Sequence, residues 1–258
     1  MQLELQDRVI VVTGGARGIG GAIVRGLVAE RAVPFVVDRA PPTEPEWTEL
    51  LSQGRAEWVT AELARPADCE QALASVLDRC GRIDGLVNNA GRNDGVGLAN
   101  GDAEKFVESL RNNLVHYYEM ARLCLPELKA RRGAIVNISS KVAETGQGGT
   151  SAYAAANGGR NALTREWATE LAPSGVRVNA VIVAECWTPM YESWLSGYST
   201  EDQATLRAQI TARIPLGKRM TETREIADAV MFLLSARASH ITGQLLHVDG
   251  GYVHLDRQ

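Results

Sequence analysis

The stretch SAYAAANGGRNALTREWA, residues 151–168, places a tyrosine and an asparagine four positions apart. On a helix, Tyr153 and Asn157 would share one face, because residues i and i+4 lie one above the other. A phenol in such a position could exchange a proton, and the asparagine could donate a hydrogen bond but supplies no charge. A lone helical tyrosine is more typical of a core or an interface, so its chemistry depends on what the rest of the chain brings to it.

A second group of residues suited to chemistry is the glycine cluster in VVTGGARGIGGAI, which contains Gly14, Gly18 and Gly20. It stands between an apolar run typical of a strand and a segment typical of a helix. Glycine permits a tight turn and lets a diphosphate approach the backbone, and a helix N-terminus offers free N–H groups. A glycine cluster alone is weak evidence, but this position between strand and helix predicts a dinucleotide site.

Asp38 ends the second apolar run, 18 residues after Gly20. A carboxylate there can accept hydrogen bonds from the adenosine ribose hydroxyls and would repel a 2′-phosphate, which favours NAD over NADP. Arg17 and Arg39 leave NADP open, because either could receive a phosphate.

The elements that must position these residues alternate along the chain. Short apolar runs (RVIVVTGG, VPFVVD, IDGLVNNAG, GAIVNISS, VRVNAVIV, QLLHVDGG) alternate with longer amphipathic segments. Strands that are apolar throughout are buried on both faces, and their alternation with helices predicts parallel βαβ units. We therefore expect one doubly wound, Rossmann-type α/β domain over residues 1–258, with a parallel sheet of about seven strands. The segment APPTEPEW is expected to be a surface loop, the segment EKFVESLRNNLVHYYEMARLCLPELKAR one long helix, and residues 188–216 a strandless substrate lid.

Composition narrows the possible partners. The chain has 258 residues and a net charge of −4, with no basic stripe for nucleic acid and no polybasic run or apolar span for a membrane. Four cysteines without a C-x-x-C pair and no visible signal peptide favour a reducing, cytoplasmic location. The four histidines (His116, His240, His247 and His254) show no ligand spacing, so we expect no metal site.

Several motifs together resemble the short-chain dehydrogenase/reductase family. They are TGGARGIG, NNAG, RNNL with Asn113, IVNISS with Ser140, the 13-residue gap from Ser140 to Tyr153, RVNAV and DGG. The likeness covers nearly the whole chain. The segments NDGVGL, NLVHYYEMA, NISSKVAETGQGGTSAY, LTREWA and VDGGYVHLDR add a likeness to bacterial L-fucose and related sugar dehydrogenases.

The resemblance implies a mechanism in which Tyr153 is the base, Ser140 holds the substrate oxygen and Asn113 holds a water. Only about 0.1% of free tyrosine is ionised at pH 7, and the family corrects this with a lysine at the position of Asn157. A cation about 4 Å away is worth at most about 4 kcal/mol at an effective dielectric of about 20. We therefore expect activity reduced roughly ten- to a thousandfold at neutral pH, an alkaline optimum, and a gain in rate from Asn157→Lys.

Two other cations could replace that lysine. Lys141 directly follows Ser140 and Arg160 lies one turn beyond Asn157. A substrate role is the simpler expectation for Lys141. Arg160 is expected to face a helix in a subunit interface, where Gly158 and Gly159 would permit close packing.

The resemblance also assigns ligand-binding residues. The implied cofactor-binding residues are Gly14, Arg17, Gly18, Ile19, Gly20, Asp38, Glu62, Leu63, Asn89, Ala90, Gly91, Tyr153, Asn157, Cys186 and Thr188. The expected substrate-binding residues are Asn93, Lys141, Gln147, Glu185 and Trp187, with Asp94 nearby.

These residues predict an NAD-dependent oxidoreductase that acts on a hydroxyl or carbonyl of a polar, sugar-like substrate such as L-fucose or a related aldose. The family implies a homo-oligomer, a tetramer or dimer. The alternatives are a catalytically weakened nucleotide-binding relative with a binding or regulatory role, and a Lys→Asn variant of an active enzyme.

Overall fold

The computed structural model describes residues 2–42 and 45–255, and a seven-stranded sheet forms its centre. Every neighbouring pair of strands is parallel, in the order β3-β2-β1-β4-β5-β6-β7. The strands are β1 Val9–Thr13, β2 Val33–Asp38, β3 Glu57–Thr60, β4 Gly85–Asn88, β5 Ala134–Ser140, β6 Arg177–Val183 and β7 Leu245–Val248. The predicted doubly wound α/β fold with a seven-stranded parallel sheet is confirmed.

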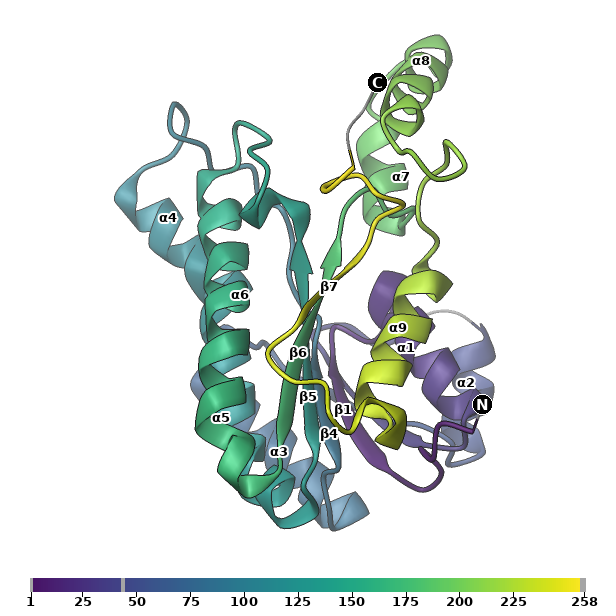
Figure 1. Cartoon of the computed structure of the whole chain (residues 1–258), viewed down its shortest axis with the longest axis vertical. Coiled ribbons are helices and arrows are strands. Elements are labelled where there is room, and N and C mark those ends of the chain that lie inside the picture. Colours follow the sequence, from purple (N-terminus) through teal and green to yellow (C-terminus); the bar gives the residue numbers. More distant parts are fainter. Residues whose placement is uncertain (1, 43–44, 256–258) are drawn as a thin grey trace.

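Helices cover both faces of this sheet (Figure 1). They are α1 Gly18–Ala29, α2 Pro45–Ser52, α3 Pro66–Cys80, α4 Ala103–Leu110, α5 His116–Arg131, α6 Ser151–Leu171, α7 Pro189–Leu195, α8 Thr200–Ala212 and α9 Thr223–Leu234. One apolar core joins the sheet to α1, α2 and α9, and a second joins it to α3, α5 and α6. The strands are buried on both faces because both cores pack against them, as their continuous apolar runs predict.

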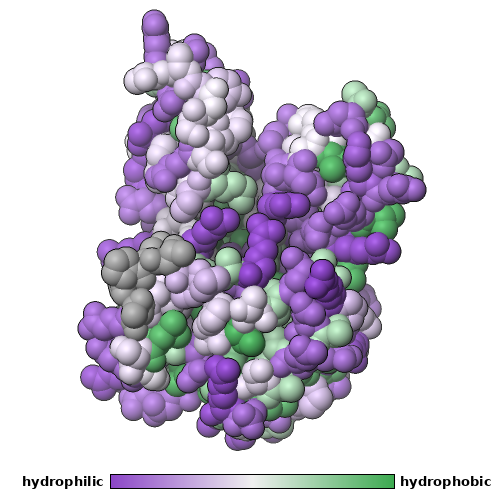
Figure 2. Space-filling view, turned by 180° about the vertical axis from the view of Figure 1, so that it is seen from behind, coloured by the Kyte–Doolittle hydropathy of each residue, from purple (hydrophilic) through white to green (hydrophobic). Residues whose placement is uncertain are grey.

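The carboxyl ends of the strands form the edge at which ligands bind in this class of fold. Strand order reverses between β1 and β4, so the loops after these two strands flank a crevice. Helices α7 and α8 rise beyond this edge (Figure 1), and a hollow with hydrophilic walls separates them from the rest of the molecule (Figure 2). Among the described residues, no helix combines the length and apolarity that crossing a membrane would need.

Four local features differ from or refine the sequence expectations. The segment APPTEPEW is not wholly a loop, because α2 begins at Pro45 and Trp47 is buried in the core. Strand β3 is half-exposed, so no apolar run in the sequence predicts it. The expected long helix is two helices joined by a π turn, Arg111–Val115. Residues 188–216 contain no strand, as expected, and form the helices α7 and α8.

Candidate active site

The glycine loop after β1 is tied to the segment that follows β4. The Thr13 hydroxyl accepts the backbone N–H groups of Asn89 at 2.9 Å and Ala90 at 3.1 Å. The Asn89 amide donates to the carbonyls of Thr13 at 3.0 Å and Gly14 at 2.9 Å. These bonds hold the two sides of the crevice at a fixed separation.

The glycines of this loop are required by its backbone. Gly14 and Gly18 have φ values of +65° and +60°, in the left-handed region. A Cβ at Gly20 would lie 2.1 Å from the Gly14 carbonyl oxygen. Arg17, the N-cap of α1, makes no side-chain capping bond, so the first N–H groups of α1 are left for another acceptor. The loop and helix end therefore fit a diphosphate.

Asp38 lies at the carboxyl end of β2, half-buried beside the glycine loop. Its carboxylate accepts the Ala16 N–H at 3.1 Å and the Ala40 N–H at 3.4 Å. These bonds hold a negative charge at the position where a ribose is expected. Arg17 and Arg39 are exposed.

The other expected cofactor residues follow the same edge with different exposure. The Leu63 side chain packs in the core, so only its backbone could reach a ligand. Ile19 packs partly against the other core, and Glu62 and Gly91 remain accessible. Burial raises the pKa of the Cys186 thiol to about 12, which keeps it neutral, and the Thr188 hydroxyl caps α7 by accepting the Tyr191 N–H at 3.3 Å.

Helix α6 carries Tyr153 and packs against the segments that hold Ser140 and Asn113. Ser140 ends β5, Tyr153 lies in the first turn of α6, and Asn113 lies in the π turn. Helix α6 packs against both the π turn and the 3-10 turn Lys141–Ala143 that follows Ser140. Asn113 is fully buried, and its side-chain oxygen accepts the Arg92 N–H at 2.8 Å.

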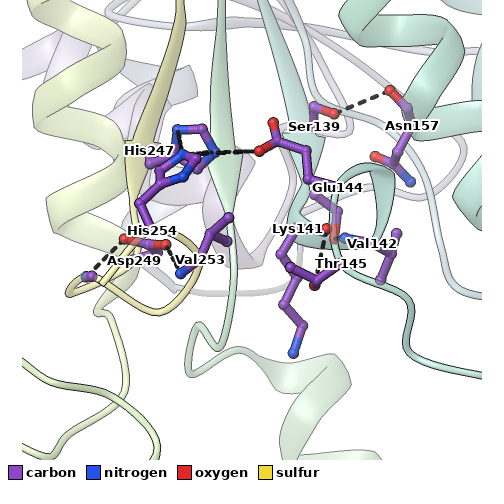
Figure 3. Close-up of polar contacts among 12 residues, drawn as sticks. Ser139, Lys141, Val142, Glu144, Thr145, Asn157, His247, Asp249, Val253 and His254 are labelled. Carbon is purple, nitrogen blue, oxygen red and sulfur yellow. Dashed lines mark hydrogen bonds and ion pairs between the residues drawn. The ribbon is translucent and has the colours of Figure 1, made fainter. Parts of the chain in front are cut away.

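Asn157 is fully buried directly below Tyr153. Its amide donates to the Tyr153 carbonyl at 2.8 Å, and its backbone carbonyl accepts the Ser139 hydroxyl at 3.3 Å (Figure 3). Its side-chain oxygen accepts from Arg160 at 3.0 Å. The amide is thus part of a fixed network and brings no charge of its own.

Arg160 was expected to face a helix in a subunit interface, but its side chain is buried within this chain. Its side chain is only 3% exposed. Its Nε donates to the Asn113 carbonyl at 2.8 Å and its Nη1 donates to the Ile138 carbonyl at 3.1 Å. Its guanidinium lies 4.2 Å from the centre of the Tyr117 ring. Gly159 also packs within the chain, since a Cβ there would meet Leu114 at 2.7 Å.

Within the described part of the chain, the second terminal nitrogen of Arg160 has no hydrogen-bond partner. A Cβ placed at Gly91 would lie 2.7 Å from this nitrogen and 3.0 Å from the Asn113 side-chain oxygen. The unpartnered N–H groups therefore border Gly91, on the wall where the cofactor is expected. The signal for this placement was Arg160's spacing of three residues from Asn157, which puts both on one helix face.

The positive charge of Arg160 affects the pKa values of two neighbouring residues. Burial, and next the Arg160 cation, lower the pKa of His116 to about 3. Burial raises the pKa of Tyr117, Arg160 opposes this rise, and Tyr153 adds to it. Arg160 and Tyr153 thus both act on Tyr117. No ion pair among the described residues neutralises Arg160.

Lys141 and Glu185 form an ion pair on the substrate side of Ser140. The Tyr191 hydroxyl of α7 donates to the second Glu185 oxygen at 3.2 Å, and the Lys141 ammonium lies 4.2 Å from the centre of the Tyr252 ring. The pair therefore joins the end of β5 to helix α7 and to the C-terminal tail. Polar groups from three segments therefore meet at the residue that follows Ser140.

The remaining expected substrate residues are more peripheral. Asn93 and Gln147 are exposed, and the Asn93 side chain accepts the Gly95 N–H at 3.1 Å. The Trp187 indole donates to Glu192 at 2.7 Å and lies under Arg207, 4.6 Å from its ring centre. Asp94, in contrast, has a buried side-chain oxygen without a partner.

Two of the histidines form a cluster with a glutamate. His247 and His254 lie against each other and against Glu144, although no spacing in the chain indicates it (Figure 3). These three side chains could hold a metal ion, and the expectation of no metal site, which rested on sequence spacing, stays a prediction.

A parallel sheet with a glycine loop at its switch point, and a helix that carries Tyr153 and packs against the turn after Ser140, are typical of a nucleotide-binding protein of the α/β class. A family model described as enoyl-(acyl carrier protein) reductase matches residues 14–253. The L-fucose dehydrogenase of Mus musculus is 36% identical over 245 residues, covering 95% of this chain and 88% of that protein. The 3-oxoacyl-(acyl-carrier-protein) reductase of Vibrio harveyi is 34% identical, covering 96% of this chain and 98% of that protein.

Solved structures agree. A crystal structure of Cj0485 dehydrogenase superposes with a TM-score of 0.96 and 42% identity, covering 100% of this chain and 98% of that one. The aldohexose dehydrogenase of Thermoplasma acidophilum gives a TM-score of 0.91 and 27% identity, with 100% and 98% covered. The chain belongs to the short-chain dehydrogenase/reductase family. It is an oxidoreductase of a family that uses nicotinamide cofactors, and sugar dehydrogenases are among its relatives.

Proposed function

We propose that this protein transfers hydride between NAD and a hydroxyl or carbonyl carbon of a polar, sugar-like substrate. The observation that carries the substrate class is the nearly buried Lys141–Glu185 pair beside Ser140, which offers charged groups to several hydroxyls. An apolar substrate would remove water from this pair and return no hydrogen bonds to it. The similarity to L-fucose and aldohexose dehydrogenases supports the same class.

The Asp38 carboxylate supports NAD as the cofactor, because it would repel the 2′-phosphate of NADP. The glycine loop and the start of α1 would hold the diphosphate, and Asp38 the adenosine ribose. When bound, the nicotinamide supplies the hydride acceptor or donor.

The chain's own residues handle the substrate proton. Ser140 orients the reacting oxygen by hydrogen bonding, and Tyr153 takes the hydroxyl proton during oxidation. The Asn113 backbone carbonyl accepts a hydrogen bond from the buried Arg160 side chain. Removal of the proton requires the Tyr153 phenolate, so a nearby positive charge favours the reaction.

Arg160 supplies that charge in place of the family's lysine. Its guanidinium is buried, carries no carboxylate partner among the described residues, and binds both Asn157 and Asn113. At an effective dielectric of about 20, a cation roughly 8 Å from a phenolate would contribute about 2 kcal/mol, which sets the scale of the effect that we expect from Arg160. The reduction in neutral-pH activity that Asn157 alone predicts is therefore partly offset.

The experiment is a steady-state assay of NADH and NADPH formation with a panel of aldoses from pH 6 to pH 10. The expected result is NAD-dependent oxidation of at least one aldose, with Tyr153→Phe reducing the rate at least a thousandfold. The rival function is that of a nucleotide-binding relative without turnover. Tight NAD binding with no oxidation at any pH would establish the rival and overturn the proposal.

A further inference from the structure

Outside the active site, one cluster of ligating side chains has a metal-binding arrangement. Glu144 follows the turn after Ser140, His247 lies on β7, and His254 lies in the C-terminal tail. In Figure 3 the Glu144 carboxylate points toward the two imidazole rings. Neither the proposed dehydrogenase mechanism nor the family relatives' names give these side chains a task.

The distances between the three donor atoms match the spacing of ligands around one ion. His247 Nε2 lies 3.1 Å from Glu144 Oε2 and 3.1 Å from His254 Nε2, and the remaining side of the triangle is 3.9 Å. A point equidistant from the corners of this triangle lies about 2.0 Å from each, close to zinc–nitrogen and zinc–oxygen bond lengths of roughly 2.0–2.2 Å. The two rings lie at 73°, and the exposed His254 ring can turn its nitrogen toward that point.

The tail is folded so that His254 returns to His247. The buried Asp249 carboxylate accepts the N–H groups of Gly251 at 2.8 Å and Val253 at 2.9 Å. Gly250 and Gly251 have φ values of +63° and +84°, which a side-chain-bearing residue adopts only at a cost. The DGG motif therefore shapes the turn that closes the cluster.

A second observation points to a ligand at the same place. Asn161 lines the groove beside the cluster together with Arg165 and Gln244. Asn161 is 6% exposed, and its side-chain oxygen has no hydrogen-bond partner among the residues that the structure describes. A small movement of this side chain toward the groove would let the oxygen accept a hydrogen bond from a water bound to an ion at the cluster.

We propose that Glu144, His247 and His254 form a binding site for one divalent transition-metal ion of the zinc class. Two imidazoles and one carboxylate with a fourth, water-filled position are a donor set that zinc takes in proteins. The ion would fasten the C-terminal tail to the turn after Ser140. Because Tyr252 of this tail lies over Lys141, bound metal would also stabilise the wall of the substrate hollow.

Isothermal titration of the metal-stripped full chain with Zn²⁺ tests the site, with thermal unfolding as a second readout. The expected result is one ion per chain, lost or weakened at least tenfold in His247→Gln, His254→Gln and Glu144→Gln. His240→Gln is the matched control, because His240 is exposed and outside the cluster. Zn²⁺ should raise the melting temperature of the wild type and of His240→Gln only.

Circular dichroism of the metal-free variants separates a lost site from a lost fold. Glu144→Gln changes a carboxylate to its neutral amide and keeps the shape, so it serves if a histidine variant unfolds. Unchanged Zn²⁺ stoichiometry and affinity in folded variants of the cluster would overturn the proposal, as would equal loss in His240→Gln. Neither result depends on whether the protein oxidises a sugar.

Discussion

Two cations flank the Ser140–Tyr153 pair, and their surroundings differ. Lys141 is paired with Glu185, so its charge is largely cancelled before it can act elsewhere. Arg160 is equally buried, but its partners are the neutral oxygens of Asn113, Ile138 and Asn157. Position in the chain favours neither of them, because each lies close to a catalytic residue.

The two cations differ in whether an opposite charge balances them. A paired charge presents a weak field at a distance, whereas an unpaired one in a medium of low dielectric acts over several ångströms. Leaving Arg160 unpaired is costly for folding, since a buried charge normally requires a counter-charge. A catalytic phenolate would supply that counter-charge. We therefore propose that Lys141 binds the substrate and that Arg160 supports the base.

Among changes to the two cations, the largest expected effect comes from Arg160→Gln, which keeps hydrogen-bond donors and removes the charge. Loss of roughly 2 kcal/mol would lower kcat near pH 7 about 30-fold. The loss in kcat should become smaller as the pH rises, because a higher pH removes the phenol proton without help from a cation. The measurement is kcat against pH for wild type and variant.

Arg160→Lys is the matched control for this loss. It retains the charge while losing part of the hydrogen-bond network, so its pH profile should remain close to that of the wild type. A structural role for Arg160 predicts instead that both variants lose activity equally at every pH.

A smaller effect is expected on the other side of the comparison. In the double variant Lys141→Met with Glu185→Leu, both charges are removed, so no buried carboxylate is left alone. KM for the sugar should rise about tenfold through lost hydrogen bonds, with the pH profile of kcat unchanged. A shifted pH profile in this variant would reverse the assignment of the two cations.

The smallest effect concerns stability and His116. Its pKa is lowered to about 3 by burial and by Arg160, while an unfolded histidine takes up a proton near pH 6.5. The unfolded state therefore binds more protons between these values, and stability falls as the pH drops from about 6.5 toward 3. His116→Asn should reduce this slope by up to about 1.4 kcal/mol per pH unit in urea unfolding. An unchanged slope would show that folding does not lower the pKa of His116.

Local motifs made much of the site predictable. The glycine loop, Asp38 and the Ser140–Tyr153 spacing each combine a backbone requirement with a chemical one in a few consecutive residues. The long apolar strands were equally clear, because burial on both faces leaves a continuous apolar run.

Features that depend on tertiary packing could not be predicted from the sequence. Strand β3 is short and partly exposed, so it lacks an apolar run. Burial of Arg160 depends on carbonyls supplied by β5 and by the π turn, which interrupts an otherwise regular helical pattern. The Glu144–His247–His254 cluster joins Glu144 to His247, 103 residues later in the chain, and a left-handed turn in the tail returns His254 to His247.

The most direct test of the central claim is a double-mutant cycle of Asn157→Lys and Arg160→Gln, read as kcat at pH 7. From the sequence alone, Asn157→Lys raises the rate. With Arg160 3.0 Å from the Asn157 side chain, the new lysine meets a like charge and the gain should be small. The account predicts that Asn157→Lys raises the rate at least tenfold more in the Arg160→Gln background than in the wild type. Equal gains in both backgrounds would contradict the claim that Arg160 replaces the missing lysine.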